Sequence, residues 1–523
     1  MTHSKLVHAM SRPDFYTHNP DSVQLLQTHI SFIFIAGDLV YKVKKAVDFG
    51  FLDFTTLEKR KFYCDEELRL NRRLASEIYL EVVPIGEDES GNLFLDAGDT
   101  IIDYAVKMKR LPEEKMLNRL ISEGKVDDSV MDRIAKRVYV FHRDAATGGE
   151  IDRIGGIDTI RHNHDENFEQ TMQYIGTSIA RDRYRFIQSY AENFLRKNRS
   201  LFEERVAGHR IRDCHGDLHL QHICIGDEIL VFDCIEFNER FRYLDVAAEV
   251  AFLSMDLDFN GYRGHASTFV NSYLRYSSDS KIKKLLNFYK CYFAYVRGKV
   301  TSFKIDDEAI EEREKKEAIE TASRYFELAY SYASSLEKPT IILMTGLMGT
   351  GKSVLAERLA PLLGAEILRT DVIRKNLLDI PSAEHHFEEF GEGIYSKEMT
   401  EKTYGEALKT AEAIIEKGGA VIVDASFKKR AERNNFSSLA DTTGADFFII
   451  ECTCSEETIK SRLKRRLLNK EEVSDGRWEI FQAQKKDFDM IGEASPGVHI
   501  IIDTSKAPER CTSEAVSRIR ISG

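Results

Sequence analysis

A glycine-rich octapeptide near residue 350 carries the clearest chemical signal in this sequence. GLMGTGKS fits the pattern G-x-x-x-x-G-K-[ST] throughout and joins an apolar run, TIILMTG, to a helical one, SVLAERLAPLLG. Its members are Gly346, Leu347, Met348, Gly349, Thr350, Gly351, Lys352 and Ser353. Glycines let successive backbone N–H groups turn toward phosphate oxygens, and the following helix adds favourable partial charge. We expect Lys352 to reach the β- and γ-phosphates of ATP and Ser353 to bind Mg²⁺.

Two carboxylates farther along the chain could complete this phosphate site. In LRTDVIRKNL, Asp371 and Arg374 lie one helical turn apart. Asp371 could accept a proton from an attacking hydroxyl while Arg374 holds phosphate, although an N-cap aspartate with a solvated arginine has the same spacing. AVIVDAS ends a buried strand at Asp424, the place of a Walker-B-like carboxylate near the metal, or of an ordinary strand-end aspartate.

An arginine-rich helix follows. IKSRLKRRLLNK puts Arg462, Arg465 and Arg466 on one helix, either as a lid over the phosphates or as a solvated face. Together with the octapeptide, these residues resemble the small P-loop kinases, a group that includes gluconate-kinase-like enzymes, polynucleotide 5′-kinases and zeta-toxin-like kinases. The resemblance spans roughly Thr340 to Thr504 and implies ATP-dependent transfer of phosphate to a hydroxyl, with Arg465 acting in the lid.

A second candidate site begins in DCHGDLHLQHICIG. His215, Gly216 and Asp217 open this segment like the catalytic loop of a phosphotransferase, and ILVFDCIEF then places Asp233 at the end of an apolar strand. An aspartate on a loop followed by an aspartate on a strand is the kinase arrangement. The first positions the acceptor hydroxyl and takes its proton, and the second binds Mg²⁺ at the nucleotide phosphates.

One position of this loop departs from the kinase pattern. Five residues after Asp217, where such loops carry a metal-binding Asn, the chain has His222. A neutral imidazole binds metals, but it suits transition metals better than Mg²⁺. His219 and His222 could share a local metal, or His222 could be a loop histidine held by hydrogen bonds. His215 is expected to brace the loop rather than to react.

A strand lysine and a helix glutamate should accompany these aspartates. VYKVKK offers Lys42 and Lys44, which share one face of a strand because they are two residues apart. FYCDEELRLN offers Glu66 and Glu67 on the next helix. We favour Lys42 as the phosphate-binding lysine, with Lys44 a close alternative, and both glutamates stay open.

This second set resembles the aminoglycoside phosphotransferase family, which has a protein-kinase-like fold. It resembles still more closely bacterial two-part proteins that join such a domain to a P-loop kinase. The matching text includes YKVKKAVDFGFLDFTTLEKRKF, EELRLNRRLA, HGDLH and FDCIEFNERFRYLDVAAEVAFL, and it covers most of Thr28 to about Leu257. The resemblance implies that Asp217 is catalytic, Asp233 a metal ligand and Asp245 a structural or secondary carboxylate. A phosphate-covering G-x-G-x-x-G loop is missing, and only Gly37 occupies the corresponding hairpin.

A similar triplet elsewhere has a different interpretation. FHRDAATGG contains His142, Arg143 and Asp144, the letters of a protein-kinase catalytic loop. Five residues after Asp144 the chain has Gly149 instead of Asn, and the triplet follows the helical run MDRIAKRVYVF. We therefore interpret it as a junction between a helix and a loop.

The elements that would position these residues fall into three regions. Residues 1–110 read as a small β-rich lobe with a hairpin at AGD and a helix capped by Thr55 or Thr56, and residues 111–338 as a mostly helical lobe. Together they give the α+β, protein-kinase-like part. Residues 339–523 alternate apolar strands with helices, which predicts an α/β P-loop domain with a parallel sheet. Pro339 marks the expected boundary.

The bulk composition narrows the function classes. The chain has 523 residues, 42% hydrophobic and 31% charged, and a net charge of −12. These values indicate a multidomain globular protein and argue against broad binding to nucleic acid or anionic membranes. The eight cysteines form no C-x-x-C pair, and no signal peptide or apolar run of membrane length is apparent. We expect a cytoplasmic protein with reduced thiols.

The leading hypothesis is a bifunctional enzyme that uses ATP and Mg²⁺ to phosphorylate hydroxyl groups of small molecules at two sites. One alternative is a nucleotide-regulated sensor or scaffold with a degenerate N-terminal domain. Another is a polynucleotide 5′-kinase that uses the arginine-rich helix, which the acidity of the chain disfavours without excluding it. The acceptors and the oligomeric state stay open.

Overall fold

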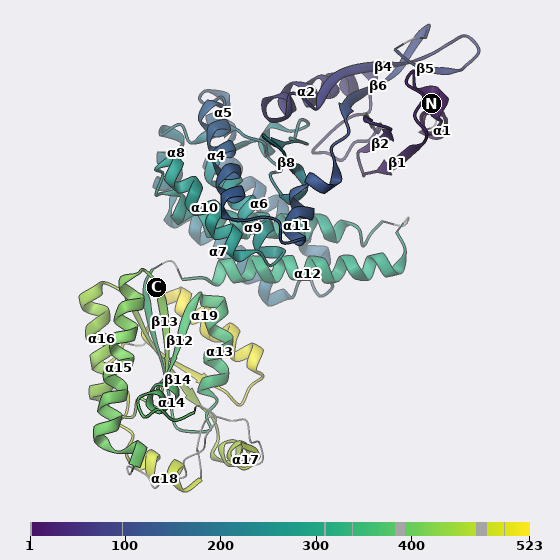
Figure 1. Cartoon of the computed structure of the whole chain (residues 1–523). Helices are drawn as coiled ribbons and strands as arrows, with labels where there is room; N and C mark the ends of the chain where they lie inside the picture. The colour runs from purple at the N-terminus through teal and green to yellow at the C-terminus, as the bar shows by residue number, and fades with distance from the viewer. Residues whose placement is uncertain are drawn as a thin grey trace. The chain divides into compact units, whose positions relative to one another are not determined.

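The protein divides into two compact units, Met1–Ala329 and Tyr330–Gly523 (Figure 1). The computed structural model describes residues 3–96, 98–307, 310–336, 338–381, 393–466, 478–495 and 497–522. The division falls within the charged helix α12 (Glu312–Ser334). Of the helices described, none combines the length and the apolarity needed to cross a bilayer.

The first unit begins with a six-stranded antiparallel sheet in the order β1-β2-β3-β6-β4-β5. The strands are β1 (Val23–Gln27), β2 (Ser31–Ala36), β3 (Leu39–Lys44), β4 (Tyr79–Glu87), β5 (Leu93–Leu95) and β6 (Thr100–Lys109). The β2–β3 hairpin turns at Gly37, whose φ of 62° favours glycine. Helix α1 (His3–Met10) and a 3₁₀ turn (Pro13–Phe15) precede the sheet.

Helix α2 (Leu57–Ala75) follows β3, and its start settles the choice of cap. The Thr56 hydroxyl accepts a hydrogen bond from the Lys59 N–H at 3.2 Å, so Thr56 rather than Thr55 is the N-cap. Cys64 and Ala75 of this helix are buried with Val106 of β6. The helix therefore presents its inner side chains to the residues of the second candidate site.

The rest of the first unit is mostly helical. Its helices are α3 (Leu117–Ser122), α4 (Asp128–Asp144), α5 (Glu150–Ile154), α6 (Ile157–Thr171), α7 (Arg181–Lys197), α8 (Arg199–Ala207), α9 (Val246–Phe259), α10 (Arg263–Ser277) and α11 (Ile282–Phe303). Two short antiparallel pairs frame the catalytic-loop motif: β7 (Ile211–Asp213) with β10 (Tyr243–Asp245), and β8 (Ile223–Ile225) with β9 (Ile229–Val231). Short 3₁₀ turns occupy Glu113–Lys115, Met172–Tyr174, Leu220–His222 and Glu239–Phe241. Helix α9 is buried over its first three turns, which anchors the loop that packs on it.

The second unit holds a five-stranded parallel sheet in the order β12-β13-β11-β14-β15. The strands are β11 (Thr340–Thr345), β12 (Ala365–Arg369), β13 (Ala420–Asp424), β14 (Asp446–Thr453) and β15 (His499–Asp503). The helices are α13 (Lys352–Leu363), α14 (Thr370–Asn376), α15 (Lys397–Glu416), α16 (Arg430–Thr443), α17 (Glu456–Arg466), α18 (Trp478–Lys486) and α19 (Pro508–Ser522), with a 3₁₀ turn at Gly393–Tyr395. The predicted parallel α/β architecture is confirmed.

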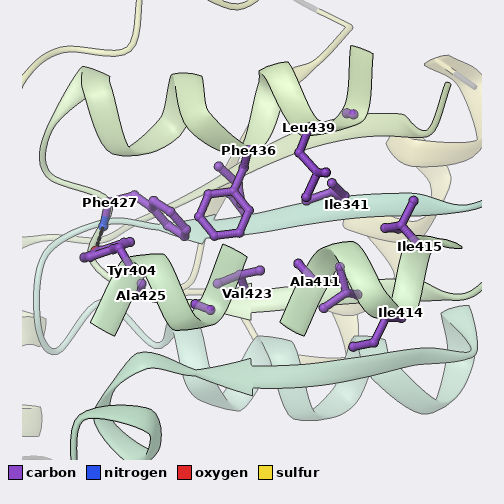
Figure 2. Close-up of a cluster of buried hydrophobic side chains, with 14 of the residues drawn as sticks. Ile341, Tyr404, Ala411, Ile414, Ile415, Val423, Ala425, Phe427, Phe436 and Leu439 are labelled. Atoms are coloured by element: carbon purple, nitrogen blue, oxygen red, sulfur yellow. Dashed lines mark hydrogen bonds between the residues drawn. The ribbon is translucent and has the colours of Figure 1, made fainter. Parts of the chain in front are cut away.

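Helices cover both faces of this sheet (Figure 1). Figure 2 shows one face, where side chains of α15 and α16 meet those of β11 and β13. Ile341 and Val423 of the strands are fully buried beneath Phe436 of α16. The Phe427 N–H donates to the Tyr404 hydroxyl at 3.2 Å, which ties the segment after β13 to α15. This core holds the carboxyl ends of β11 and β13 side by side.

Candidate active sites

In the first unit, lysines of β3 and acidic residues from α2 and the segment after β9 form a buried ion-pair cluster. Lys42 Nζ lies 2.9 Å from Glu67 Oε1 and 2.6 Å from Asp233 Oδ1. Lys44 Nζ lies 2.7 Å from the other oxygen of Glu67 and also pairs with Glu236. Although burial raises the pKa of Glu67, the two ammonium groups outweigh it and hold that pKa below its ordinary value. Glu67 therefore orients both lysines.

The contacts of this cluster distinguish between the two candidate glutamates and between the two candidate lysines. Glu66 points away from the cluster and pairs with Arg69 of its own helix at 2.6 Å, so it is not the glutamate that meets the strand lysines. Because both lysines contact Glu67, spacing alone could not distinguish them. Lys42 is the one that contacts Asp233, whereas Lys44 pairs with Glu236. Glu236 was not predicted as a member of this cluster, although it lies three residues after Asp233.

The catalytic-loop motif brings Asp217 and Asp233 to opposite sides of His222. His222 Nδ1 lies 3.0 Å from the backbone oxygen of Asp217, and its Nε2 lies 3.5 Å from Asp233 Oδ2. Burial lowers the pKa of His222 to about 4, so this ring is neutral at neutral pH. Burial raises the pKa of Asp217, but the interaction with His219 outweighs burial and holds that pKa below its ordinary value, so the group is ionised. Asp217 is therefore able to accept a proton.

A buried carboxylate that the sequence did not single out holds this loop. Glu249 of α9 accepts the backbone N–H groups of His215 and Gly216 on one oxygen, at 2.8 and 2.6 Å. Its other oxygen lies 2.7 Å from His142 Nε2, and His142 Nδ1 lies 2.8 Å from the Tyr273 hydroxyl. His215 itself contacts the Phe232 carbonyl through Nε2, at 3.0 Å, as expected of a bracing residue.

Two other sequence-based interpretations can be placed. Helix α4 ends at Asp144 of the His-Arg-Asp triplet, which confirms the predicted junction between a helix and a loop. His142 of this triplet contacts Glu249, on the side away from the catalytic loop. Asp245 forms a buried bidentate pair with Arg205, at 2.6 and 2.8 Å, and caps α9 through the Ala247 N–H. Asp245 is thus a structural carboxylate.

In the second unit the octapeptide forms a tight loop between β11 and α13. Gly346, Gly349 and Gly351 have φ values of 130°, 78° and 89°, which side chains rarely adopt. A Cβ atom at Gly346 would lie 2.6 Å from the Cys452 carbonyl oxygen. Lys352 Nζ donates to the Leu347 carbonyl at 3.1 Å, so the ammonium group lies across the loop. These features are those of a phosphate-binding P-loop.

The carboxylates predicted beside this loop gather at one edge of the sheet. Asp424 ends β13 in register with Met344 of β11 and Arg369 of β12, and Asp371 follows β12 directly. Burial raises the pKa of Asp424, which interacts with Lys352 and Ser353. Asp424 and the Ser353 hydroxyl supply the oxygen ligands that Mg²⁺ prefers, so the residues fit that ion.

The pair Asp371 and Arg374 is also formed. Arg374 Nη1 lies 3.1 Å from Asp371 Oδ1, and its guanidinium stacks over the Tyr395 ring at 4.8 Å. Arg374 is buried, whereas the Asp371 side chain is 45% exposed. The arginine is thus held in place beside a carboxylate that is open to an acceptor.

The arginines of α17 differ in their contacts and in their exposure. Arg462 donates to the Thr504 carbonyl at 2.7 Å and to the Gly349 carbonyl at 3.4 Å, whereas Arg465 is exposed. Both line a cavity of about 420 Å³ beside the P-loop, together with Gly351, Val354 and Thr504. The side chain of Arg466 lies outside the described residues. Arg462 thus contacts the loop, while Arg465 lines the cavity and its predicted place in a lid stays a prediction.

The single tryptophan of the chain should report on this loop. Trp478 packs on the cluster of Ile459, Leu463 and Phe481, to which Leu347 and Met348 also belong. We expect the non-hydrolysable analogue AMPPNP to change tryptophan fluorescence saturably. Lys352→Ala should weaken this binding about 10- to 100-fold, because a charge-assisted contact is lost. Asp217→Asn, in the other unit, should leave the titration unchanged, and a signal that persisted fully in Lys352→Ala would contradict the assignment.

Comparison with known proteins agrees with this description of the second unit. Residues 341–491 match the family model described as AAA domain, a stretch that includes the P-loop, Asp371 and Asp424. A protein of Mycobacterium bovis and one of Mycobacterium tuberculosis, both named as uncharacterized, are each 29% identical over 447 residues, covering 85% of this chain and 86% of theirs. A match of this length must extend into both units of this chain.

Several solved kinases show weaker structural similarity. A sugar kinase from Janibacter is 19% identical, covers 35% of this chain and 95% of its own, and gives a TM-score of 0.27. The APS kinase of Mycobacterium tuberculosis, solved with AMPPNP and APS, is 16% identical, covers 35% of this chain and 98% of its own, and gives a TM-score of 0.27. A choline/ethanolamine kinase family protein from Mesorhizobium loti is 11% identical, covers 62% of this chain and 99% of its own, and gives a TM-score of 0.36. TM-scores this low do not establish a shared fold over the chain.

Proposed function

We propose that this protein is a bifunctional ATP-dependent phosphotransferase, with one transfer site in each unit and small hydroxylated molecules as acceptors. The observation that carries this proposal is a similar arrangement of carboxylates and a lysine in each of the two units. In the first unit His222 lies between Asp217 and Asp233, and Lys42 contacts Asp233. In the second unit Asp424 interacts with both Lys352 and Asp371. Each unit thus offers a candidate proton acceptor, a candidate metal ligand and a lysine. Phosphoryl transfer requires mainly positioning and charge neutralisation, which these two sets provide.

In the first unit, Asp217 would accept the proton of the acceptor hydroxyl as its oxygen bonds to the γ-phosphorus of ATP and the bond to the β-phosphate oxygen breaks. Lys42, oriented by Glu67, would neutralise phosphate charge. Asp233 would hold a divalent cation on those phosphates. The cation supplies electrostatic stabilisation of the phosphates when bound.

In the second unit, backbone N–H groups of the P-loop and Lys352 would hold the β- and γ-phosphates, and Ser353 and Asp424 would hold Mg²⁺. Asp371 would take the acceptor proton while Arg374 binds phosphate or acceptor. The cavity beside Gly351 offers room for the nucleoside half of ATP, under Arg462.

The test is transfer of the labelled γ-phosphate of ATP to a panel of small hydroxylated metabolites, and to an oligonucleotide with a 5′-hydroxyl. Wild type, Asp217→Asn and Lys352→Ala are compared as full chains. We expect each variant to lose one set of products and keep the other. Loss of all transfer in Lys352→Ala would contradict two transfer sites and favour a sensor with a degenerate first unit. Labelling of the oligonucleotide alone would identify a polynucleotide kinase instead.

A further inference from the structure

The three histidines of the catalytic-loop motif have different hydrogen-bond partners, and these partners fix different ring tautomers. His215 and His219 each accept a backbone N–H on Nδ1, from Asp217 and Gln221, both at 3.3 Å. An Nδ1 that accepts an N–H carries no hydrogen, so in both rings the hydrogen is on Nε2. In His215 it meets the Phe232 carbonyl, and in His219 it faces Asp217 Oδ2 at 3.5 Å.

His222 has the opposite arrangement. Its Nδ1 lies 3.0 Å from the Asp217 backbone oxygen, which can only accept, so the ring hydrogen is on Nδ1. The lone pair of Nε2 is then directed toward Asp233 Oδ2 at 3.5 Å. At 3.5 Å these two atoms are farther apart than an ordinary hydrogen bond allows. A cation bound by both atoms would bridge them.

The distance fits a bound transition-metal ion. Two ligand atoms at about 2.1 Å from one ion lie about 3.0 Å apart at the right angle of an octahedral site and about 3.4 Å apart at a tetrahedral angle, so the two atoms are close enough to share an ion. The Nδ1 hydrogen bond to a backbone carbonyl is the outer contact that metal-binding histidines usually make, because it fixes the ring and its tautomer. The other oxygen of Asp233 contacts Lys42, so Oδ2 is the oxygen directed to His222.

We propose that His222 Nε2 and Asp233 Oδ2 form a mixed nitrogen–oxygen site that binds a first-row transition-metal ion such as Mn²⁺ in preference to Mg²⁺. Mg²⁺ binds oxygen ligands and keeps much of its water, whereas imidazole is a good ligand for transition metals. The ligand-type atoms of Asp217, His219 and His222 also lie within 4.8 Å of one another. His219 is not a ligand in this assignment because its Nε2 hydrogen is directed at Asp217, which stays available to the acceptor.

The proposal concerns the ion of the first transfer site, but its test needs neither ATP nor an acceptor. Mn²⁺ alone is added to the metal-free full-length protein, and pulsed electron paramagnetic resonance is used to detect nitrogen coupled to the bound ion. We expect nitrogen coupling in wild type and its loss in His222→Asn, which places an amide oxygen at the site. His219→Asn, the matched control, should retain it. In competition with Mg²⁺, His222→Asn should lower the preference for Mn²⁺ at least about tenfold.

The possible results separate the two proposals. Absence of nitrogen coupling in wild type, or its persistence in His222→Asn, would overturn the assignment, and loss in His219→Asn would show that the ligand set is wrong. Nitrogen coupling of the expected pattern without any phosphate transfer would support the ion site and count against the proposed enzyme function only. The phosphate-side ligands of the second unit, Ser353 and Asp424, contribute oxygen and give no such nitrogen coupling.

Discussion

Glu67→Gln is expected to lower the free energy of unfolding of the first unit by about 1.5–3 kcal/mol, because it removes a buried, charge-assisted hydrogen-bond partner that two lysines share. Glu67 is fully buried and contacts Lys42 and Lys44 at 2.9 and 2.7 Å. Its loss leaves two ammonium groups facing Asp233 and Glu236, and removes the group that directs both lysines. The rate of phosphate transfer at the first site should also fall, because the position of Lys42 depends on Glu67.

The neighbouring residue provides a matched control. Glu66→Gln removes the same charge one position earlier, where the carboxylate pairs with Arg69 near the surface, and such pairs contribute about 0–1 kcal/mol. Urea unfolding of the full chain, followed by circular dichroism, measures both variants. Equal effects of the two substitutions would show that the lysines do not depend on Glu67.

Glu249→Gln should lower kcat of the first site about 100-fold, since a misplacement of about 1 Å in a reacting group can have an effect of that size. The carboxylate accepts three N–H groups, from His215, Gly216 and His142. A carboxamide has only one acceptor oxygen, so its NH₂ group must face at least one of these donors. The loop that carries Asp217 would shift.

The separate kinetic constants distinguish positioning from general loss of structure. We expect kcat to fall while the KM for ATP changes little, because the phosphate-side residues Lys42 and Asp233 do not contact Glu249. Each lost hydrogen bond to the carboxylate should also lower the free energy of unfolding by about 1.5–3 kcal/mol. Glu203→Gln, at an exposed position of α8, serves as the control. A normal kcat in Glu249→Gln would refute the positioning role.

Much of the second unit was predictable from local patterns. Apolar runs predicted β11, β13, β14 and β15, and the P-loop motif predicted the loop and the start of α13, because both depend on residues that are neighbours in sequence. The parallel sheet then places Asp424 and Asp371 at the carboxyl edge of the strands. The role of Arg465 stays a prediction, because arginines three residues apart on one helix have equal local patterns, and only packing brings Arg462 to Thr504.

The first unit shows the limit of such patterns. Motif order alone indicated Asp217, Asp233 and the pair of strand lysines. The choice of Glu67 over Glu66 depends on which face of α2 is buried against β3, and both positions fit the motif. The central strand β6 was not anticipated, although it pairs with both β3 and β4.

The amino-acid sequence by itself determined which residue types are present at motif spacing: the P-loop, the two aspartates of each site, and a histidine where an asparagine is usual. Only the tertiary structure decided their partners. Sequence motifs assigned Glu249, Glu236 and His142 no role at the first site, and these residues reach it through contacts between distant segments. The ring tautomer of His222, and with it the inferred choice of metal ion, depends on a backbone carbonyl that no pattern of side chains records.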